Sequence, residues 1–181
     1  MFKALLSALV IAVAVPATAG ELSVQLPGRE GLVLSLPSGW RGQVDQSGAG
    51  MPPTITITSN EPSAFQILVT PLWPVGSAKA PTAADVRNLV QGATEQVRSR
   101  AVERDLPLTE LSAPGKLGYY FSATDREVEP NGYKYLTQGA VGFGELRVTF
   151  TILMNRRPQE TAAKALEVVR TMRRTPAKSA T

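Results

Sequence analysis

The chain has 181 residues, a formal net charge of +4 at pH 7, and neither cysteine nor histidine. The absence of cysteine excludes disulfides, thiolate chemistry and a lipid-modified N-terminal cysteine. The absence of histidine excludes Ser-His-Asp and Cys-His catalysis and nearly all zinc and copper sites.

The first 19 residues have the three-part architecture of a secretory signal peptide. Lys3 supplies the positive region, the run from Leu5 to Val15 is apolar or small, and Ala17-Thr18-Ala19 forms an A-x-A cleavage site. The apolar run is shorter than the roughly 20 residues of a membrane-spanning helix. We expect cleavage after Ala19 and residence in the periplasm, with secretion from the cell as the alternative. A buried N-terminal helix is the other interpretation of this segment.

Alternation of apolar and polar residues predicts four strands in the next part of the chain. The first two are separated by a Pro/Gly break and are predicted to form a hairpin that closes at Pro37-Ser38-Gly39-Trp40. In the third, isoleucines face one side and threonines the other. The four strands are residues 22–26, 32–36, 54–58 and 65–69.

Two segments are predicted to be loops by their composition, residues 45–53 and residues 71–81. The second is too rich in proline for a regular element. Trp73 lies between two prolines, so we expect an exposed side chain that contacts a partner. Trp40 is the other tryptophan candidate for a contact surface, but a ring that follows a turn more often covers the core.

A helix of about 18–20 residues is predicted to follow, beginning with Thr82 and Asp85 as a capping box. Its apolar side chains recur at helical spacing, which predicts one buried stripe. The stripe comprises Val86, Leu89, Val90, Ala93 and Val97.

The second half is predicted to be mostly strands. Residues 102–113 form an irregular strand and residues 119–124 a regular one. Pro130-Asn131-Gly132 then predicts a type I′ hairpin. Residues 133–141 are predicted to form the second strand of this hairpin, with Tyr133 and Tyr135 expected to pair across the sheet with Tyr119 or Phe121. After a turn at Gly142-Phe143-Gly144, residues 146–154 show the longest alternation and predict a central strand with one half-covered face.

A last helix is predicted from Pro158, which suits the first helical position, and the tail after Arg174 is expected to be disordered. The basic side chains of this region, with Arg173 and Arg174 as the candidates, are expected to complement the helix dipole. Weak contact with an anionic surface is the alternative. The apolar stripe of this helix comprises Ala162, Ala165, Leu166, Val169 and Met172.

The order strands, helix, strands, helix with short turns predicts an α+β sandwich: a mainly antiparallel sheet with two amphipathic helices. We expect a signal peptide at 1–19, a single domain at 20–175 and a disordered tail at 176–181. The chain resembles the PsbP-like superfamily, which includes periplasmic proteins of the DcrB type. The resemblance lies in the strand closing at Trp40, the helix at about 82–100, the strand through Gly118-Tyr119-Tyr120, and the strand 145–154 followed by a helix. It implies an α/β/α sandwich and a role in binding proteins.

No catalytic motif stands out, and we expect neither enzymatic activity nor a cofactor. The glycine-rich stretch 139–144 is followed by a strand, which favours a hairpin over a phosphate loop. Asp125, Glu127 and Glu129 alternate, so they would share one strand face; whether they bind a cation stays open.

The first functional hypothesis is therefore an interaction or adaptor domain of the bacterial cell envelope with a protein partner and no nucleic acid. The alternative is a carrier of a small ligand or lipid, with a pocket between sheet and helix. An enzyme that uses carboxylates or Tyr and Lys alone is the third.

Overall fold

A computed structural model describes most of the chain after the predicted signal peptide. The described residues are 20–26, 30–46, 51–60, 65–73, 79–111 and 113–175. The predicted signal peptide at 1–19 and the predicted tail at 176–181 lie outside them. No helix of the described part is long and apolar enough to cross a membrane.

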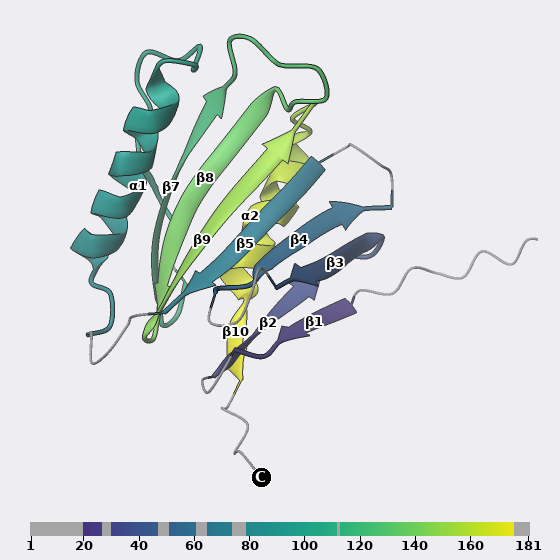
Figure 1. Ribbon diagram of the computed structural model, residues 1–181, viewed down its shortest axis with the longest axis vertical. Coiled ribbons are helices and arrows are strands. Elements are labelled where there is room, and N and C mark those ends of the chain that lie inside the picture. Colours follow the sequence, from purple (N-terminus) through teal and green to yellow (C-terminus); the bar gives the residue numbers. More distant parts are fainter. Residues whose placement is uncertain are drawn as a thin grey trace, which may run out of the picture.

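The strands of this structure form two sheets, and two helices cover them (Figure 1). The helices are α1 (Ala83–Arg98) and α2 (Gln159–Thr171). The strands are β1 (Gly20–Val24), β2 (Gly31–Leu36), β3 (Trp40–Asp45), β4 (Thr54–Ser59), β5 (Phe65–Leu72), β6 (Thr109–Glu110), β7 (Lys116–Thr124), β8 (Tyr135–Phe143), β9 (Leu146–Met154) and β10 (Arg173–Thr175).

All strand pairs in both sheets are antiparallel. The large sheet has the order β3-β4-β5-β9-β8-β7-β6, and the small sheet has the order β1-β2-β10. The predicted hairpin of the first two strands is confirmed by the pairing of β1 with β2. The expected central position of residues 146–154 is confirmed too, because β9 pairs with β5 on one side and β8 on the other.

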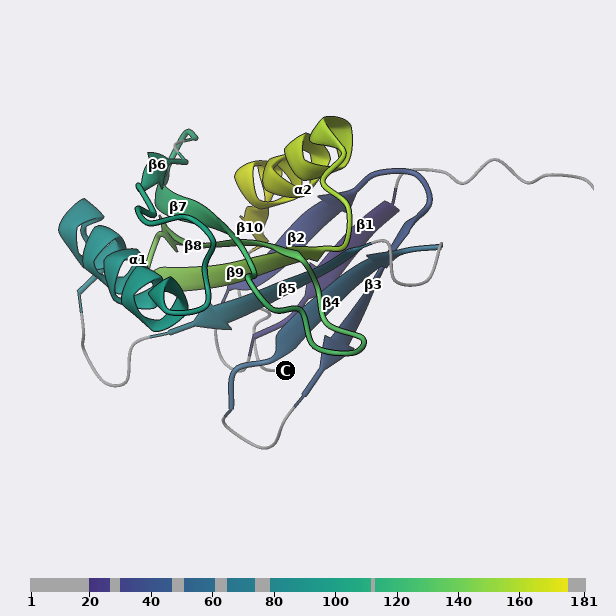
Figure 2. The same cartoon turned by 90° about the horizontal axis from the view of Figure 1, so that it is seen from above.

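The two helices lie on opposite faces of the large sheet (Figure 2). On one face, α2 and β2 pack against inward-facing side chains of the large sheet. On the other face, α1 packs against β7 and β8. The predicted α+β sandwich is therefore confirmed, with the core divided between these two layers.

The alternation of β9 decides which side chains enter the main core. Leu146, Val148, Phe150, Ile152 and Met154 are all buried on the α2 side. The intervening residues of β9 are only half-buried. In β4 the isoleucines are buried and the threonines half-buried, as predicted.

A buried lysine ties α2 to the edge of this core. Lys116, on β7, donates a hydrogen bond from Nζ to the carbonyl oxygen of Arg170 in the last turn of α2. Its ammonium also lies 4.8 Å from the centre of the Phe143 ring. Burial lowers the pKa of Lys116, because removing the charge from water costs free energy.

The first half of the sheet differs from the prediction at two places. Residues 40–45 form an edge strand, β3, which was not predicted because Gly42 and the charged residues there weaken the alternation; it includes Asp45, which was expected in the loop 45–53. Residues 71–72 belong to β5, in spite of Pro71. The pairing of β5 with β4 ends at Val69, so Pro71 has no β4 residue opposite it that would need its missing N–H. On the other side, Pro71 still lies opposite Val148 of β9.

The hairpin predicted at Pro130-Asn131-Gly132 has a different geometry. A long loop, residues 125–134, joins β7 to β8. Gly132 donates its backbone N–H to the carbonyl of Glu129 over 2.8 Å, and Asn131 has a φ of 65°. Proline fixes a negative φ at the first central position, so the turn is type II rather than type I′.

Smaller differences follow from local geometry. The strand expected at residues 102–113 is reduced to the two-residue β6. β8 starts at Tyr135 rather than at Tyr133. The last tight turn is made by Gly144, whose φ is 61°. Tyr119 pairs with Ala140, so the expected tyrosine pairing across the sheet was wrong. Pro158 is the N-cap of α2, one residue before the expected position. Residues 173–175 form β10, which was not predicted.

Candidate functional site

The site centres on α1, whose start is fixed by its own sequence. Thr82 accepts a hydrogen bond from the Asp85 backbone N–H, and the Asp85 carboxylate accepts one from the Thr82 backbone N–H, as the predicted capping box requires. Hydrogen bonds donated by Thr82 to this carboxylate lower the pKa of Asp85. The helix therefore begins at one defined residue above the sheet.

Only part of the predicted apolar stripe of α1 enters the core. Val86, Val90 and Thr94 are buried, and they pack above Phe121, Ala123 and Ala140 of the sheet. Leu89 is 37% exposed, and Ala93 and Val97 are half-buried. The stripe is wider than the contact with the sheet, so its other side borders open space.

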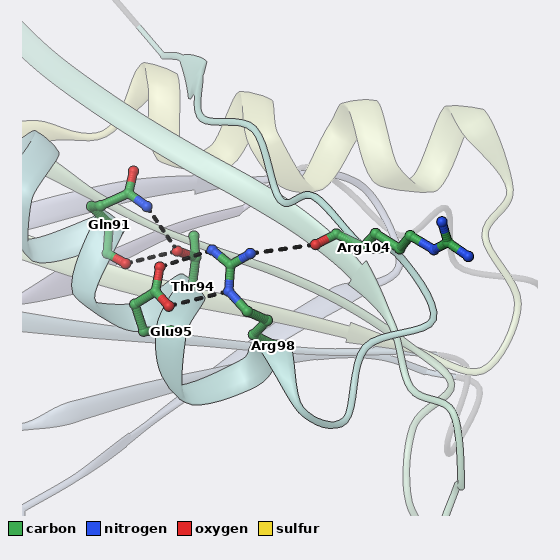
Figure 3. Close-up of polar contacts among 5 residues, drawn as sticks. All are labelled: Gln91, Thr94, Glu95, Arg98 and Arg104. Carbon is green, nitrogen blue, oxygen red and sulfur yellow. Dashed lines mark hydrogen bonds and ion pairs between the residues drawn. The ribbon is translucent and has the colours of Figure 1, made fainter.

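The flank of α1 that faces away from this open space is held by polar contacts (Figure 3). The hydroxyl of Thr94 donates to the Gln91 carbonyl over 2.7 Å and accepts from the Gln91 amide over 3.1 Å. Arg98 binds both carboxylate oxygens of Glu95 and also reaches the carbonyl of Arg104 at 3.4 Å. These contacts connect α1 to the chain that follows it.

A groove runs along the opposite flank of α1, between the helix and the large sheet, and we call it the α1 groove. Its first part is a depression of about 400 Å³. Leu89, Gly92 and Gln96 line it from α1, and Gln138 and Thr149 from the sheet. A Cβ atom added to Gly92 would meet nothing within 4 Å, so the helix backbone is open to the groove there.

The groove deepens into an apolar pocket of about 230 Å³ near the end of α1, and we call it the anchor pocket. Gln96 borders both this pocket and the preceding depression, so the two adjoin. Apolar side chains from α1, β7, β8 and β9 form most of its walls. They are Val97, Ala101, Ala123, Leu136 and Leu153, with Tyr133 at the side.

An ion pair stands at the far end of the anchor pocket. Nη2 of Arg100 lies 2.8 Å from Oδ2 of Asp125. Both residues also line a third, polar depression of about 540 Å³ formed with the loop 126–129. The ion pair therefore separates the anchor pocket from a polar surface beyond it.

The floor of the α1 groove continues into an uncovered, uncharged part of the large sheet. Cross-strand neighbours place Thr56, Leu68, Thr151 and Gln138 in one row across four strands. A parallel row contains Thr70 and Thr149, and all of these side chains are half-buried. Beyond α1, no described helix covers this face (Figure 2).

The charged groups around the anchor pocket are engaged with each other or with neighbouring parts of the chain. The charged residues that line the anchor pocket, Arg100 and Asp125, pair with each other. Catalysis needs convergent groups with perturbed pKa values in a cleft. The nearby Glu103 has a lowered pKa: burial alone would raise it, but the hydrogen bonds from Thr124 outweigh that effect. Those bonds also explain its role, which is to fasten the chain after α1 to β7.

The two tryptophans proposed from the sequence lie away from the α1 groove. The Trp40 ring centre is 4.3 Å from that of Phe65, and the side chain is half-buried against the main core. Trp73 is half-buried against the same core, so it is less exposed than we expected from the sequence. Parts of the two predicted loops 45–53 and 71–81, namely residues 47–50 and 74–78, lie outside the described residues.

The two arginines proposed for anionic surfaces are engaged within the molecule. Arg173 forms an ion pair with Glu21 of β1. Arg174 lies 2.8 Å from Glu30 and 5.5 Å from the centre of the Phe143 ring. Both residues belong to the short β10, and these contacts attach it to the small sheet and the core.

The three carboxylates that alternate in the sequence do not share a strand face. β7 ends at Thr124, so Asp125, Glu127 and Glu129 lie in the loop that follows. Asp125 pairs with Arg100 and accepts the backbone N–H of Glu127. Among the described residues, no group of three or more acidic side chains is placed to hold a metal ion.

The α1 groove was missed by the sequence analysis, although one signal pointed to it. Leu89 and Ala93 extend the apolar stripe of α1 beyond what Val86, Val90 and Thr94 need for core packing. A stripe of that width indicates a second contact. Its opposite wall, Leu136 and Leu153, comes from strands distant in sequence and could not be assigned from spacing.

The fold is that of the PsbP-like proteins. The solution structure of cyanobacterial PsbP (CyanoP) from Synechocystis is similar over 93% of this chain and 98% of that chain, with a TM-score of 0.55 and 15% sequence identity. This similarity defines the fold and not the activity. No protein-family model and no curated protein sequence matches the chain.

Proposed function

We propose that this chain is a non-enzymatic protein-binding domain of the bacterial cell envelope, exported by its N-terminal signal and docked through the α1 groove. The observation that carries the proposal is the groove itself. A rigid helix and a β-sheet form a mainly uncharged depression that adjoins an apolar pocket. Interfaces are typically centred on such pockets, which receive an anchor side chain from the partner.

Export is supported by the sequence, because a positive region, a short apolar run and the A-x-A site Ala17-Thr18-Ala19 follow one another as in a cleavable signal peptide.

A carrier of a small ligand is the second candidate, because its expected pocket between sheet and helix corresponds in position to the anchor pocket. Pockets for small molecules usually measure about 300–1,000 Å³. The anchor pocket alone measures about 230 Å³, but with the adjoining depression of about 400 Å³ the groove reaches that range, so volume does not separate the two candidates. A cavity of about 150 Å³ already accepts a benzene ring, so one bulky side chain fits well.

The proposal is tested by photo-crosslinking in living cells. A photoreactive amino acid with a small aliphatic diazirine side chain, close to glutamine in size so that the groove stays open, replaces Gln96, which borders the groove, or Ala84, which is exposed on the opposite flank of α1. We expect one envelope protein to be crosslinked from position 96 and not from position 84. Crosslinks from position 84 alone, or none from position 96 in folded protein, would contradict docking at the groove.

A further inference from the structure

We propose that the occupant of the α1 groove is an extended, uncharged peptide segment of the partner, which inserts one bulky apolar side chain into the anchor pocket. This inference rests on the proposed function and specifies the chemistry of the partner. It is drawn from the length of the groove, its polar groups and the size of the pocket at its end.

The length of the groove suits a short extended segment. The wall formed by α1 and the turn after it runs from Asn88 to Arg100. At 1.5 Å per residue this wall is about 18 Å long. An extended chain advances about 3.3 Å per residue, so about five or six residues fit along it.

The polar groups of the groove match a peptide backbone. Asn88 and Gln96 from α1 and Gln138 from β8 each present a carboxamide. A carboxamide donates and accepts, which is what a peptide unit requires of its partner. Within the described part of the chain, no hydrogen bond joins these three side chains to another residue. The backbone of a bound segment could therefore form hydrogen bonds with these carboxamides.

The charge of the groove selects an uncharged segment. Between Asn88 and Gln96, the residues that line it are polar or apolar but carry no charge. At the pocket end, Arg100 and Asp125 neutralise each other. A charged side chain laid along this wall would lose its hydration without gaining a partner, which costs free energy. Small neutral residues around one apolar anchor avoid that cost.

The backbone of α1 is open at the centre of the groove. Gly92 is exposed and has no Cβ, and the space that a Cβ would occupy is empty. Glycine has a stability cost in a helix interior relative to alanine. Close approach of a peptide to the helix at this position gives that cost a function.

Peptide panning with purified mature protein is the first half of the test. A library of random hexapeptides is selected against the protein, and the enriched peptides are measured by fluorescence anisotropy. We expect peptides with one Phe, Leu, Met or Trp among small uncharged residues. Replacement of that one residue by Ala should weaken binding at least about tenfold, since burying such a side chain contributes more than 1.4 kcal/mol. Enrichment of charged peptides without an apolar anchor would overturn the inference.

Variants locate the binding. Gln96→Trp fills the junction of the groove and the anchor pocket, whereas Ala84→Trp adds the same ring to the opposite flank. Both positions are exposed, so both variants should fold, which a melting curve checks. We expect Gln96→Trp to weaken the selected peptides at least about tenfold and Ala84→Trp to leave them unchanged. Equal binding by both variants would overturn the inference.

The remaining outcomes separate this inference from the proposed function. If position 96 crosslinks an envelope protein but no peptide is selected, the groove binds a folded surface; the inference falls and the proposed function stands. If palmitate raises the melting temperature and Gln96→Trp abolishes that effect, the pocket takes an acyl chain and both fall. If neither peptide nor crosslink is found, both fall as well.

Discussion

The two faces of the large sheet are built from the same strands but are used in opposite ways. On the α2 side, β9 contributes Phe150 and Ile152 to a core closed by α2 and the small sheet. On the α1 side, the same strand presents Thr149, Thr151 and Leu153, which remain half-buried. The helix on that side covers β7 and β8 and leaves β9, β5 and β4 uncovered.

This difference separates stability from binding. The α2 face holds most of the large buried side chains, so it supplies most of the free energy of folding. The α1 face holds a smaller core and the groove. Side chains on the groove flank of α1 can therefore be altered without unfolding the protein.

The largest predicted effect contrasts neighbouring residues of β9. Phe150→Ala should destabilise the protein by about 3–5 kcal/mol, because it removes a buried ring and leaves a cavity. Thr151→Ala, on the other face, should change the free energy of unfolding by no more than about 0.5 kcal/mol. Urea unfolding curves measure both. Similar losses for the two variants would show that both faces contribute equally to the fold.

The next effect concerns the hydrogen bonds between Glu103 and Thr124, which attach the chain after α1 to β7 and which we call the Glu103 clamp. Glu103→Gln should cost about 1–2 kcal/mol, because the Glu103 carboxylate accepts hydrogen bonds from the Thr124 backbone N–H at 2.8 Å and hydroxyl at 2.7 Å.

The same clamp predicts a pH dependence. The pKa of Glu103 is lowered from 4.5 in the folded state. The stabilisation is therefore complete above about pH 4.5 and is lost as the pH falls through the folded-state pKa. Unfolding measured between pH 6 and pH 3 should show a smaller acid loss in the Glu103→Gln variant than in the wild type. An identical pH profile would remove the clamp from the account.

A smaller effect is expected at the start of α1. Thr82→Ala removes a side-chain cap and should cost about 1 kcal/mol. Amide hydrogen exchange should accelerate in the first turns of α1. The exchange of α2 should not change, because Thr82 caps α1 alone. The N-cap of α2, Pro158, makes no side-chain capping bond, and α2 is held by packing. Faster exchange throughout both helices would mean that the two faces unfold together.

The smallest effect has the opposite sign. Gly92→Ala should stabilise the protein by about 0.5–1 kcal/mol, because alanine is the better helix former and its Cβ meets no neighbour. The same variant should weaken the peptides selected against the wild type. Thermal unfolding and anisotropy on one preparation test both. A variant that is neither more stable nor weaker in binding would remove the proposed role of Gly92.

Sequence reasoning predicted the elements that have a strong period and missed the features that depend on tertiary contact. The alternation of residues 146–154 and the capping box at Thr82 were both confirmed. β3 was missed because its inward side includes Gly42, which the Leu22 side chain approaches closely. β10 was missed because Arg173 and Arg174 alone do not predict a strand; their pairing with β2 creates it.

The candidate site was less accessible to sequence reasoning than the fold. Trp40 and Trp73 were chosen by residue type, and the structure places both against the main core. The anchor pocket needs Val97 from α1 and Leu136 and Leu153 from two later strands. No spacing rule brings these residues together, because antiparallel register and the position of α1 over the sheet decide which side chains share the pocket.

The most direct test of the account combines one groove variant with the crosslinker at position 96. Gly92→Leu fills the centre of the α1 groove, and Ala84→Leu adds the same side chain on the opposite flank. Both proteins should melt within a few degrees of the wild type, since both sites are exposed. We expect the envelope-protein crosslink to be lost in Gly92→Leu and kept in Ala84→Leu. A crosslink of equal yield in both variants would contradict docking through the α1 groove.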